Sequence, residues 1–382
     1  MNTKTFSILA IVTALVVIAA VMLTPQKPTT PEPEKFFPNL MSALSEVTEI
    51  NVRTKDNSIT MIRGDGQWLL KEKHNYPVAV DKVNKLLLGA ADLTVVEAKT
   101  SNPALYSKIG VEDQSTLLTL KKGESETVAS LIIGNNRVAK VDSTRRKIYV
   151  RKPDDKQTWL TLGQLPLEKN PKDWLERQII DIDSNNIRRV SITHADGDKV
   201  VVFKDSPKDE NYQLADLPEN AKVKAAQLLN DIASTLTRLN LDDVTTDIEF
   251  DDKASTRAVF TTFDGLEVTM TTTKKEGKHY AKFAAAFNSA AVFVEPPKTD
   301  DQAQTEKADD KPKVDAKKQA DTLNAKFKGW VYELANVDNL EKKRDDLIEK
   351  PAEEEKAADE ASAVEESKEL PIPFTQSDED TP

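Results

Sequence analysis

The chain contains no cysteine among its 382 residues. It therefore cannot form disulfides, use a thiolate nucleophile, bind zinc or iron–sulfur clusters through sulfur, or carry a lipoprotein anchor. Glycine is also scarce, and only Gly64-Asp65-Gly66 brings two of the 11 glycines close together, in a hairpin context. The sequence has no phosphate-binding glycine loop and no Gly-x-Ser-x-Gly elbow. These absences argue against nucleotide hydrolysis and serine hydrolase chemistry.

Clusters of basic residues are missing too. The net charge is −11, but residues 351–382 contain eleven acidic residues and two lysines, so this tail carries −9 of it. The rest of the chain is nearly neutral, and it offers no electrostatic footprint for nucleic acid. We exclude nucleic acid as a partner and expect residues 351–382 to be a disordered acidic tail.

One long hydrophobic run is present, at residues 6–23, where only Ser7 and Thr13 are polar. Eighteen helical residues cover roughly 27 Å, which is close to the thickness of a bilayer core. We predict a retained transmembrane helix because the run continues through Leu23 without a helix breaker. A cleaved signal peptide, with Ala19 and Ala20 near the cleavage site, is the alternative. Lys4 precedes the span, which places residues 1–5 in the cytoplasm and the bulk of the chain outside.

The segment at residues 24–38 holds five prolines. Proline at this density prevents both helix and sheet pairing, so we expect an extended stalk. A chain of this length exceeds what one hydrophobic core usually organises, and we expect two folded units beyond the stalk.

The folded region repeats one pattern at an offset of about 140 residues. Apolar residues alternate around turns at Asp56-Asn57 and Gly64-Asp65-Gly66, and again around Ala195-Asp196-Gly197. Each strand meander precedes an amphipathic helix, and two or three further strands follow. The first predicted helix carries Val80, Val83, Leu86, Leu87, Ala90 and Leu93, and the second carries Val223, Ala226, Leu229, Ile232 and Leu236. We therefore predict an α+β protein with two similar modules, residues 39–153 and 185–350, from an internal duplication.

Three further segments complete this organisation. Residues 154–184 join the modules, and Trp174, Leu175 and Ile179 predict a helix there. Residues 296–320 form a highly charged insertion in the second module, which we expect to be a solvated loop. Leu334, Val337, Leu340, Leu347 and Ile348 predict a closing helix.

Candidate chemistry is sparse, and we assign no catalytic, cofactor-binding or metal residue. Asp181, Asp183 and Asn185 match the first, third and fifth positions of a calcium loop, but Asn186 and Ile192 replace the glycine and glutamate that it needs. Asp183 is better interpreted as a turn acceptor. The three histidines are far apart in sequence, each near a turn or strand end: His74, His194 and His279.

Paired carboxylates remain the enzyme hypothesis that is hardest to dismiss, because glycoside hydrolysis needs only two acids a few ångströms apart. The acid clusters beside apolar strands are Asp242, Asp243, Glu249, Asp251 and Asp252. In a chain so rich in acids, solubility and turn chemistry are the better explanation. Four aromatic residues, Trp68, Tyr76, Tyr106 and Trp159, could line a groove, although their spacing fits strand cores equally well.

Several segments resemble an uncharacterised bacterial family of membrane-anchored proteins, classed as a domain of unknown function. The longest is Ser101–Asp113, in which Asn102 and Pro103 would start a short helix and Gly110 would end it. The others are Asp65-Gly66-Gln67-Trp68, Tyr76-Pro77, Trp174-Leu175-Glu176-Arg177 and Trp330-Val331-Tyr332-Glu333-Leu334. Members of that family are typically encoded beside gliding-motility-auxiliary-type ABC transporter components. The resemblance implies a transporter-associated envelope protein, and because the family has no established catalytic residues, none is carried over to this chain.

These observations lead to one hypothesis and two alternatives. We expect a non-enzymatic accessory or binding protein, anchored by a single span in a bacterial inner membrane, with transporter subunits as partners and no cofactor. The first alternative is an envelope glycan hydrolase that uses paired carboxylates. The second is a structural spacer without a ligand.

Overall fold

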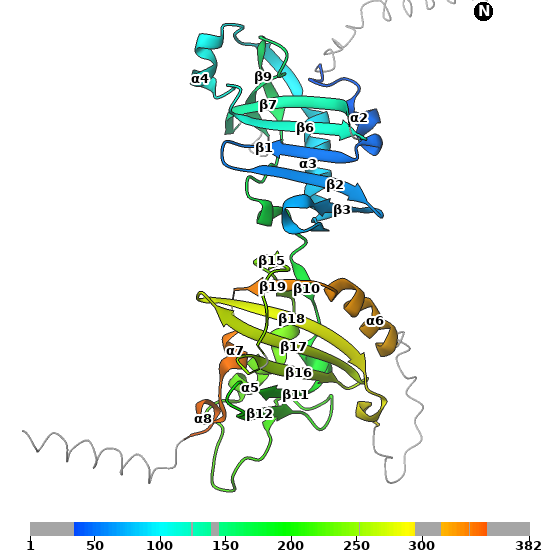
Figure 1. Cartoon of the computed structure of the whole chain (residues 1–382), viewed down its shortest axis with the longest axis vertical. Coiled ribbons are helices and arrows are strands. Elements are labelled where there is room, and N and C mark those ends of the chain that lie inside the picture. The colour runs from blue at the N-terminus through cyan, green and yellow to red at the C-terminus, as the bar shows by residue number, and fades with distance from the viewer. Residues whose placement is uncertain are drawn as a thin grey trace, which may run out of the picture. The chain divides into compact units, whose positions relative to one another are not determined.

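The computed structural model describes residues 34–123, 125–138, 145–251, 253–294, 315–335 and 337–349. Within these ranges the chain is an α+β protein with two large antiparallel sheets and several short helices (Figure 1). The fold class predicted from the sequence is confirmed at this level. The predicted span at residues 6–23, the stalk to residue 33 and the acidic tail lie outside the described residues.

The first sheet has nine strands in the order β4-β3-β2-β1-β6-β7-β8-β9-β5. Their bounds are β1 Glu49–Arg53, β2 Ser58–Gly64, β3 Gln67–Leu70, β4 Tyr76–Pro77, β5 Thr94–Ala98, β6 Thr116–Lys122, β7 Glu126–Val138, β8 Arg146–Arg151 and β9 Thr158–Gly163. The helices in this part of the chain are α2 Leu40–Ala43, α3 Val80–Asp92 and α4 Tyr106–Ile109.

The second sheet has eight strands in the order β13-β12-β11-β16-β17-β18-β19-β15, and β10 pairs separately with β14. Their bounds are β10 Gln178–Ile180, β11 Ile187–Thr193, β12 Lys199–Phe203, β13 Gln213–Leu214, β14 Leu239–Asn240, β15 Asp243–Thr245, β16 Thr256–Thr262, β17 Leu266–Lys275, β18 Lys278–Phe287 and β19 Val331–Leu334. The helices are α5 Ala226–Ala233, α6 Ala316–Phe327, α7 Asp338–Glu341 and α8 Arg344–Leu347.

The two sheets share one strand order. Apart from β4, each strand of the first sheet has a counterpart at the same place in the second, from β3 and β13 at one end to β5 and β15 at the other. The registers agree as well, since Leu70 pairs with Met61 on β2 and Leu214 pairs with Val202 on β12. The counterpart of β8 is therefore β18, and β19 corresponds to β9. The 140-residue repeat pattern predicts that Ile148–Val150 corresponds to the segment Trp330–Tyr332, and this prediction is wrong by one strand.

Contacts divide the chain into two compact units. The first comprises residues 1–58 and 84–167, and the second comprises residues 59–83 and 168–382. The segment that contains β3 and β4 is thus counted with the second unit. Sequence periodicity cannot predict this assignment, because it depends on which side chains meet after folding.

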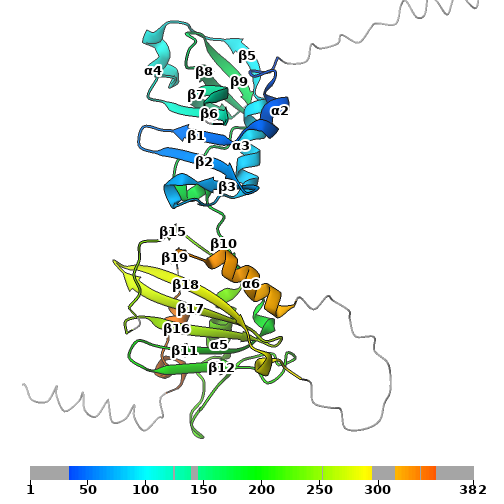
Figure 2. The same ribbon diagram turned by 45° about the vertical axis from the view of Figure 1, so that its right-hand side comes forward.

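The cores follow the alternation of apolar residues that the strands impose. In the first unit Ile50, Val52, Leu118 and Leu120 are fully buried on the paired strands β1 and β6. α3 lies beside these strands in both ribbon views (Figures 1 and 2). Its apolar stripe at Val83, Leu86, Leu87 and Ala90 is buried as predicted, whereas Val80 at its first turn is exposed.

In the second unit the sheet is covered by α5, whose Leu229 and Ile232 are buried. α5 contacts β11, β12 and β13. The helix is shorter than the sequence predicts, because Val223 forms an isolated bridge with Ile348 and Leu236 lies in a 3-10 turn.

Three other predictions differ from the structure. Residues 171–180 form a 3-10 turn, Pro171–Trp174, and strand β10 instead of a helix, because Ile180 pairs with Leu239 on β14. The predicted closing helix is strand β19 followed by the single-turn helices α7 and α8. The insertion predicted as a solvated loop ends within α6, which lies against β17 and β18 and buries Ala316 and Ala320.

Candidate binding site

The second unit contains a cavity of about 510 Å³ with a largely apolar wall. This volume lies within the range of about 300–1,000 Å³ that is typical of small-ligand sites. The lining residues are Gln67, Leu69, Asn75, Tyr76, Pro77, Glu176, Ala325, Lys326 and Trp330. All of them belong to the segments 59–83 and 168–382.

Three chain segments build this cavity. Strand β4 supplies Tyr76 through its pairing with Leu70 on β3. The Glu176 amide donates to the Pro77 carbonyl at 3.0 Å, which fixes the second segment beside β4. The third segment runs from the end of α6 to β19, and Gly329, with a φ of 84°, makes the turn that leads to Trp330. Left-handed backbone of this kind favours glycine.

Two of the lining residues, Tyr76 and Trp330, are aromatic and belong to a cluster of packed rings. The Tyr76 ring lies 5.1 Å from the Trp330 ring at an interplanar angle of 82°. It also lies 6.2 Å from the Tyr332 ring, again edge to face. Such T-shaped contacts suit the ring quadrupoles and add to the burial of apolar area. Tyr76 and Tyr332 are both almost fully buried, so Tyr332 supports the Tyr76 ring that lines the cavity beside Trp330.

Burial also sets the protonation of these groups. It raises the pKa of Tyr76 and of Tyr332 well above the ordinary value of 10, and the carboxylate of Glu176 adds to the effect on the pKa of Tyr76. Partial burial lowers the pKa of Lys326, against the opposing effect of Glu176. The Lys326 Nζ donates to the Gln178 carbonyl at 2.6 Å. The cavity therefore has an apolar, aromatic wall with one acidic and one basic side chain.

This cavity is where the family-like segments meet. Gln67, the pair Tyr76-Pro77, Glu176 and Trp330 come from four of the five segments quoted for the resemblance, and all of them line it. The sequence patterns mark Trp330 and Glu176 only as parts of those segments, and they do not mark Lys326. No local pattern marks Lys326, since it is one of several lysines on an amphipathic helix.

The fifth segment lies in the first unit and behaves as predicted. The Asn102 side chain accepts from the Ala104 amide at 3.1 Å, and Gly110 ends α4 with a φ of 70°. The Tyr106 hydroxyl donates to the Lys156 carbonyl at 2.7 Å, and the Arg151 guanidinium lies 4.7 Å from the centre of its ring. Ile109 packs on the cluster of Tyr106, Val111 and Ile132, so the segment is structural here.

The candidate carboxylates do not gather in one cleft. Asp242 pairs with Arg177 at 2.9 Å, and Asp243 pairs with Lys73 at 2.7 Å. Successive residues along a strand point to opposite faces, which explains their different partners. Glu249 and Asp251 are exposed, and Asp251 accepts from the Lys253 amide in a turn. Asp252 lies outside the described residues.

The calcium-like segment and the histidines have other roles. Asp183 accepts from the Asn185 amide at 2.9 Å, as expected of a turn residue, and Asp181 accepts from the Arg238 amide. His194 is buried with its Nε2 at 3.2 Å from the Lys342 carbonyl oxygen, and His279 lies 3.2 Å from Glu341. His74 is exposed. Among the described residues, no three acidic or histidine side chains are placed to hold a metal ion.

The aromatic residues that the sequence suggests for a groove, and the segment Gly64-Asp65-Gly66, have mainly structural roles. Trp68, Tyr76 and Tyr106 are buried, and Trp159 is half-buried on β9. Only Tyr76 also lines the cavity. Asp65 and Gly66, both with positive φ, form the turn between β2 and β3.

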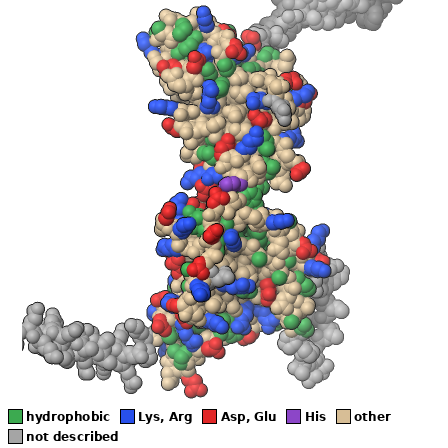
Figure 3. Space-filling model, viewed as in Figure 1, with side chains coloured by type: hydrophobic (Ala, Val, Ile, Leu, Met, Phe, Trp, Pro, Cys, Tyr) green, Lys and Arg blue, Asp and Glu red, His purple; other side chains and the backbone are tan. Residues whose placement is uncertain are grey.

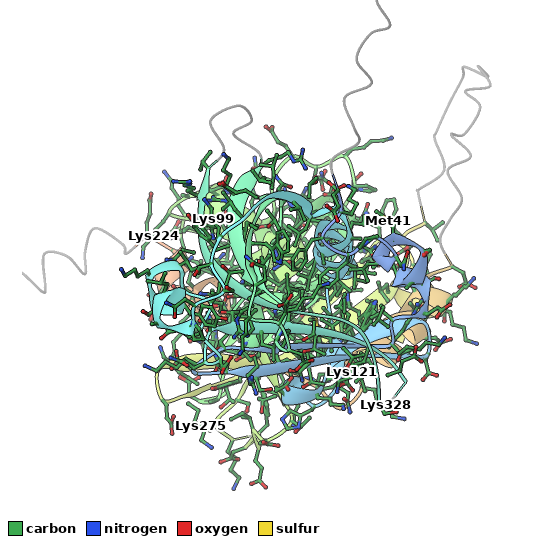
Figure 4. All side chains as sticks on the ribbon, turned by 90° about the horizontal axis from the view of Figure 1, so that it is seen from above. Met41, Lys99, Lys121, Lys224, Lys275 and Lys328 are labelled. Carbon is green, nitrogen blue, oxygen red and sulfur yellow. The ribbon has the colours of Figure 1, made fainter. Side chains whose placement is uncertain are left out.

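The surface of the chain is charged and mixed. On the face seen in Figure 3, acidic and basic side chains are interspersed. Lysines such as Lys224, Lys275 and Lys328 lie at the margin of the ribbon in Figure 4, and all three are exposed. Mixed charge of this kind favours solubility.

The fold and the cavity together define an α+β protein with two antiparallel sheets of matching strand order. A model of a family described as a domain of unknown function (DUF4340) matches residues 68–258, which is half of the chain. The chain belongs to this family. No curated protein and no solved structure matches it. Within the described residues, no helix is long and apolar enough to cross a bilayer.

Proposed function

We propose that this chain is a non-enzymatic accessory protein of an ABC-type transport system, anchored in the membrane with its folded part outside the cytoplasm. The anchor is the apolar run at residues 6–23 and the spacer is the proline-rich segment that follows. The transporter association rests on the family resemblance of the quoted segments.

The observation that carries a binding role is the aromatic cavity of the second unit. Its wall is preformed by Tyr76, which is buried and packs against the Tyr332 ring, while Trp330 is half-buried and accessible to a ligand. Sites of this kind bind apolar or aromatic groups, and a few polar side chains fix their orientation. In this cavity Glu176 and Lys326 would supply that orientation. We assign the cavity to a side chain or substrate group presented by the transport system.

We also propose that the two sheets arose by internal duplication. The strand order that the two sheets share apart from β4, the matching registers at Leu70 and Leu214 and the helix after each meander support this origin. In this view β4 is a later addition to the first copy, and Tyr76 on β4 is a residue that the second copy lacks.

The test is co-purification of the full chain, tagged at its C-terminus and extracted in detergent, followed by identification of the bound proteins. We expect an ATPase and a permease subunit to be recovered. Exchange of residues 1–24 for a cleavable signal should abolish their recovery. Trp330→Ala should reduce it about tenfold, as for an aromatic residue at the centre of an interface.

Trp159→Ala is the matched control, because Trp159 is a half-buried tryptophan of the first unit. It should leave recovery unchanged. Failure of the wild-type chain to recover any transporter subunit would contradict the proposal. Equal recovery with Trp330→Ala and Trp159→Ala would instead favour a spacer that does not use the cavity.

A further inference from the structure

A second cavity of the same unit, of about 400 Å³, has a different chemical character. It is lined by three cationic side chains, Arg188, Arg189 and Lys204. The other lining residues are Phe203, Asp205, Thr261, Glu267 and Ala291. Arg188 and Arg189 lie on β11, Lys204 directly follows β12, and these two strands lie side by side in both ribbon views (Figures 1 and 2).

A β-bulge brings the two arginines together. Ile187 and Arg189 of β11 pair with Thr262 and Thr261 of β16, so Arg188 is an extra residue on its strand. On a regular strand neighbouring side chains point to opposite faces, whereas a bulge re-aims one of them. Both arginines therefore reach one cavity.

The bulge also holds the lysine. The Lys204 amide donates to the Arg188 carbonyl at 2.8 Å, so the backbone of Lys204 is fixed directly beside the bulge. The Lys204 residue is only 3% exposed. Its Nζ lies 4.7 Å from the centre of the Tyr212 ring and makes no hydrogen bond to the described residues. A buried ammonium that has only a ring face as partner lacks the acceptors that usually accompany burial.

The position of the Lys204 ammonium over the Tyr212 ring is well defined, because the ring itself is fixed by hydrogen bonds. The Tyr212 hydroxyl lies 2.6 Å from the carbonyl oxygens of Ser184 and Ile187, which share its single proton, and the Tyr212 amide donates to the Asn230 side chain at 3.1 Å. The ring is therefore held at both ends. Tyr212 keeps Lys204 at the cavity wall instead of releasing it into solvent.

None of the three cations is ion-paired with a carboxylate in the described part of the chain. Arg188 donates to the Ala291 carbonyl at 3.1 Å, and Arg189 donates to the Ser191 hydroxyl at 3.2 Å. The two acids of the cavity are engaged elsewhere: Glu267 accepts from Asn288 at 2.9 Å and Asp205 accepts from Gln213 at 3.4 Å. Positive charge thus remains available to a ligand.

We propose that this cavity binds the phosphate group of a small phosphorylated polyol. Arginine guanidinium groups and a lysine ammonium together match the geometry and charge of a phosphate. The carboxylate oxygens of Asp205 and Glu267 that do not accept from Gln213 and Asn288 would accept from the hydroxyls of the polyol. The site is separate from the aromatic cavity, and its test does not depend on the transporter association.

The test is calorimetric titration of the full chain in detergent at low ionic strength, with inorganic phosphate and with glycerol phosphate as probes. Glycerol phosphate distinguishes a polyol ester from the free anion, and it should bind more tightly because of the added hydroxyls. Lys204→Met and Arg189→Gln should each weaken binding about tenfold or more, the usual effect of losing a charged hydrogen bond.

Lys282→Met is the matched control, because the Lys282 Nζ also lies over an aromatic ring, 4.5 Å from the centre of Phe250, but outside this cavity. It should bind like the wild type. Arg189 is exposed, so Arg189→Gln decides the question if Lys204→Met does not fold. The proposal is overturned if the wild type shows no saturable binding, or if Arg189→Gln binds as the wild type does. It is also overturned if Lys282→Met weakens binding equally, since general charge would then be the cause.

Discussion

The hydroxyl of Tyr212 lies within hydrogen-bond distance of two backbone carbonyls, those of Ser184 and Ile187, which share its single proton. Tyr212→Phe leaves both acceptors without this donor while it keeps the ring under Lys204. We expect a loss of about 1–3 kcal/mol in the free energy of unfolding, measured by urea denaturation. Tyr280→Phe is the control, because the Tyr280 hydroxyl makes no hydrogen bond to the described residues. Equal effects of the two variants would refute the role given to the Tyr212 hydroxyl.

Buried tyrosines predict sensitivity to alkaline pH. Burial raises the pKa of Tyr76, Tyr212 and Tyr332 above the value of 10 for the unfolded chain. Their neutral forms therefore contribute stability that is fully present below pH 10 and is lost as the pH rises further. We expect the free energy of unfolding to fall by up to about 1.4 kcal/mol per pH unit for each such tyrosine above pH 10.

The measurement is urea unfolding at pH values from 8 to 11.5. Tyr76→Phe removes one ionisable hydroxyl and should make the alkaline fall less steep, without changing the profile between pH 8 and 9. A wild-type profile that stays flat above pH 10 would contradict the prediction.

For single residues, the sequence predicts local structural roles, such as caps and turns, better than it predicts which residues line a binding site. Asn102, Gly110 and Asp183 behave as predicted because caps and turns depend on neighbours within a few positions. Lys204 and Lys326 could not be singled out, because their surroundings come from Tyr212 and Glu176, which a local pattern does not connect with them.

Among the elements, α4 depends on the glycine that ends it. Gly110 has a φ of 70°, and an added Cβ would lie 2.8 Å from the Asn135 Oδ1. Gly110→Ala should therefore cost more than the roughly 1–2 kcal/mol that left-handed backbone alone imposes on alanine. Gly123→Ala isolates that backbone cost, because Gly123 has a φ of 63° and an added Cβ would meet nothing within 4 Å. Thermal unfolding of both variants checks the difference, and equal costs would contradict it.

α6 covers an edge of the second sheet. β19 pairs with β18 only at residues 279–281, so β18 continues beyond its partner. The Asn324 side chain of α6 accepts from the Ala285 amide at 2.8 Å and donates to the Ala285 carbonyl at 2.7 Å, which occupies the open backbone groups.

Asn324→Leu removes both of these bonds. We expect faster hydrogen exchange at Ala285 by about tenfold or more, measured by mass spectrometry, since one or two hydrogen bonds of about 1 kcal/mol each are lost. Lys317→Leu, on the exposed first turn of the same helix, is the control and should leave exchange there unchanged. Unchanged exchange in Asn324→Leu would show that the edge is protected by other means.

Two elements, β10 and α6, are not predicted from the sequence because neither carries a recognisable period of large apolar residues. Alternation and helical periodicity identify α3 and the meander strands, which bury a single face. β10 was mistaken for part of a helix, because a three-residue strand is too short for a period to be recognised. α6 was missed because its buried side chains are mainly small, Ala316 and Ala320, with Phe327 at its end.

For the whole molecule, two compact units predict two unfolding steps. Gly110→Ala lies in the first unit and Tyr212→Phe in the second. Each variant should accelerate hydrogen exchange mainly within its own unit, because cooperative opening follows compact units. Exchange that rises equally throughout the chain in both variants would show a single cooperative unit instead.

The second unit is assembled from two stretches that are far apart in the chain, and this has a consequence for synthesis. Tyr76 leaves the ribosome 256 residues before Tyr332, against which it packs. At a translation rate of about 5–20 residues per second, the interval is roughly 13–50 s. During that time the aromatic surface of β4 has no partner, which makes it a natural place for a chaperone to hold the nascent chain.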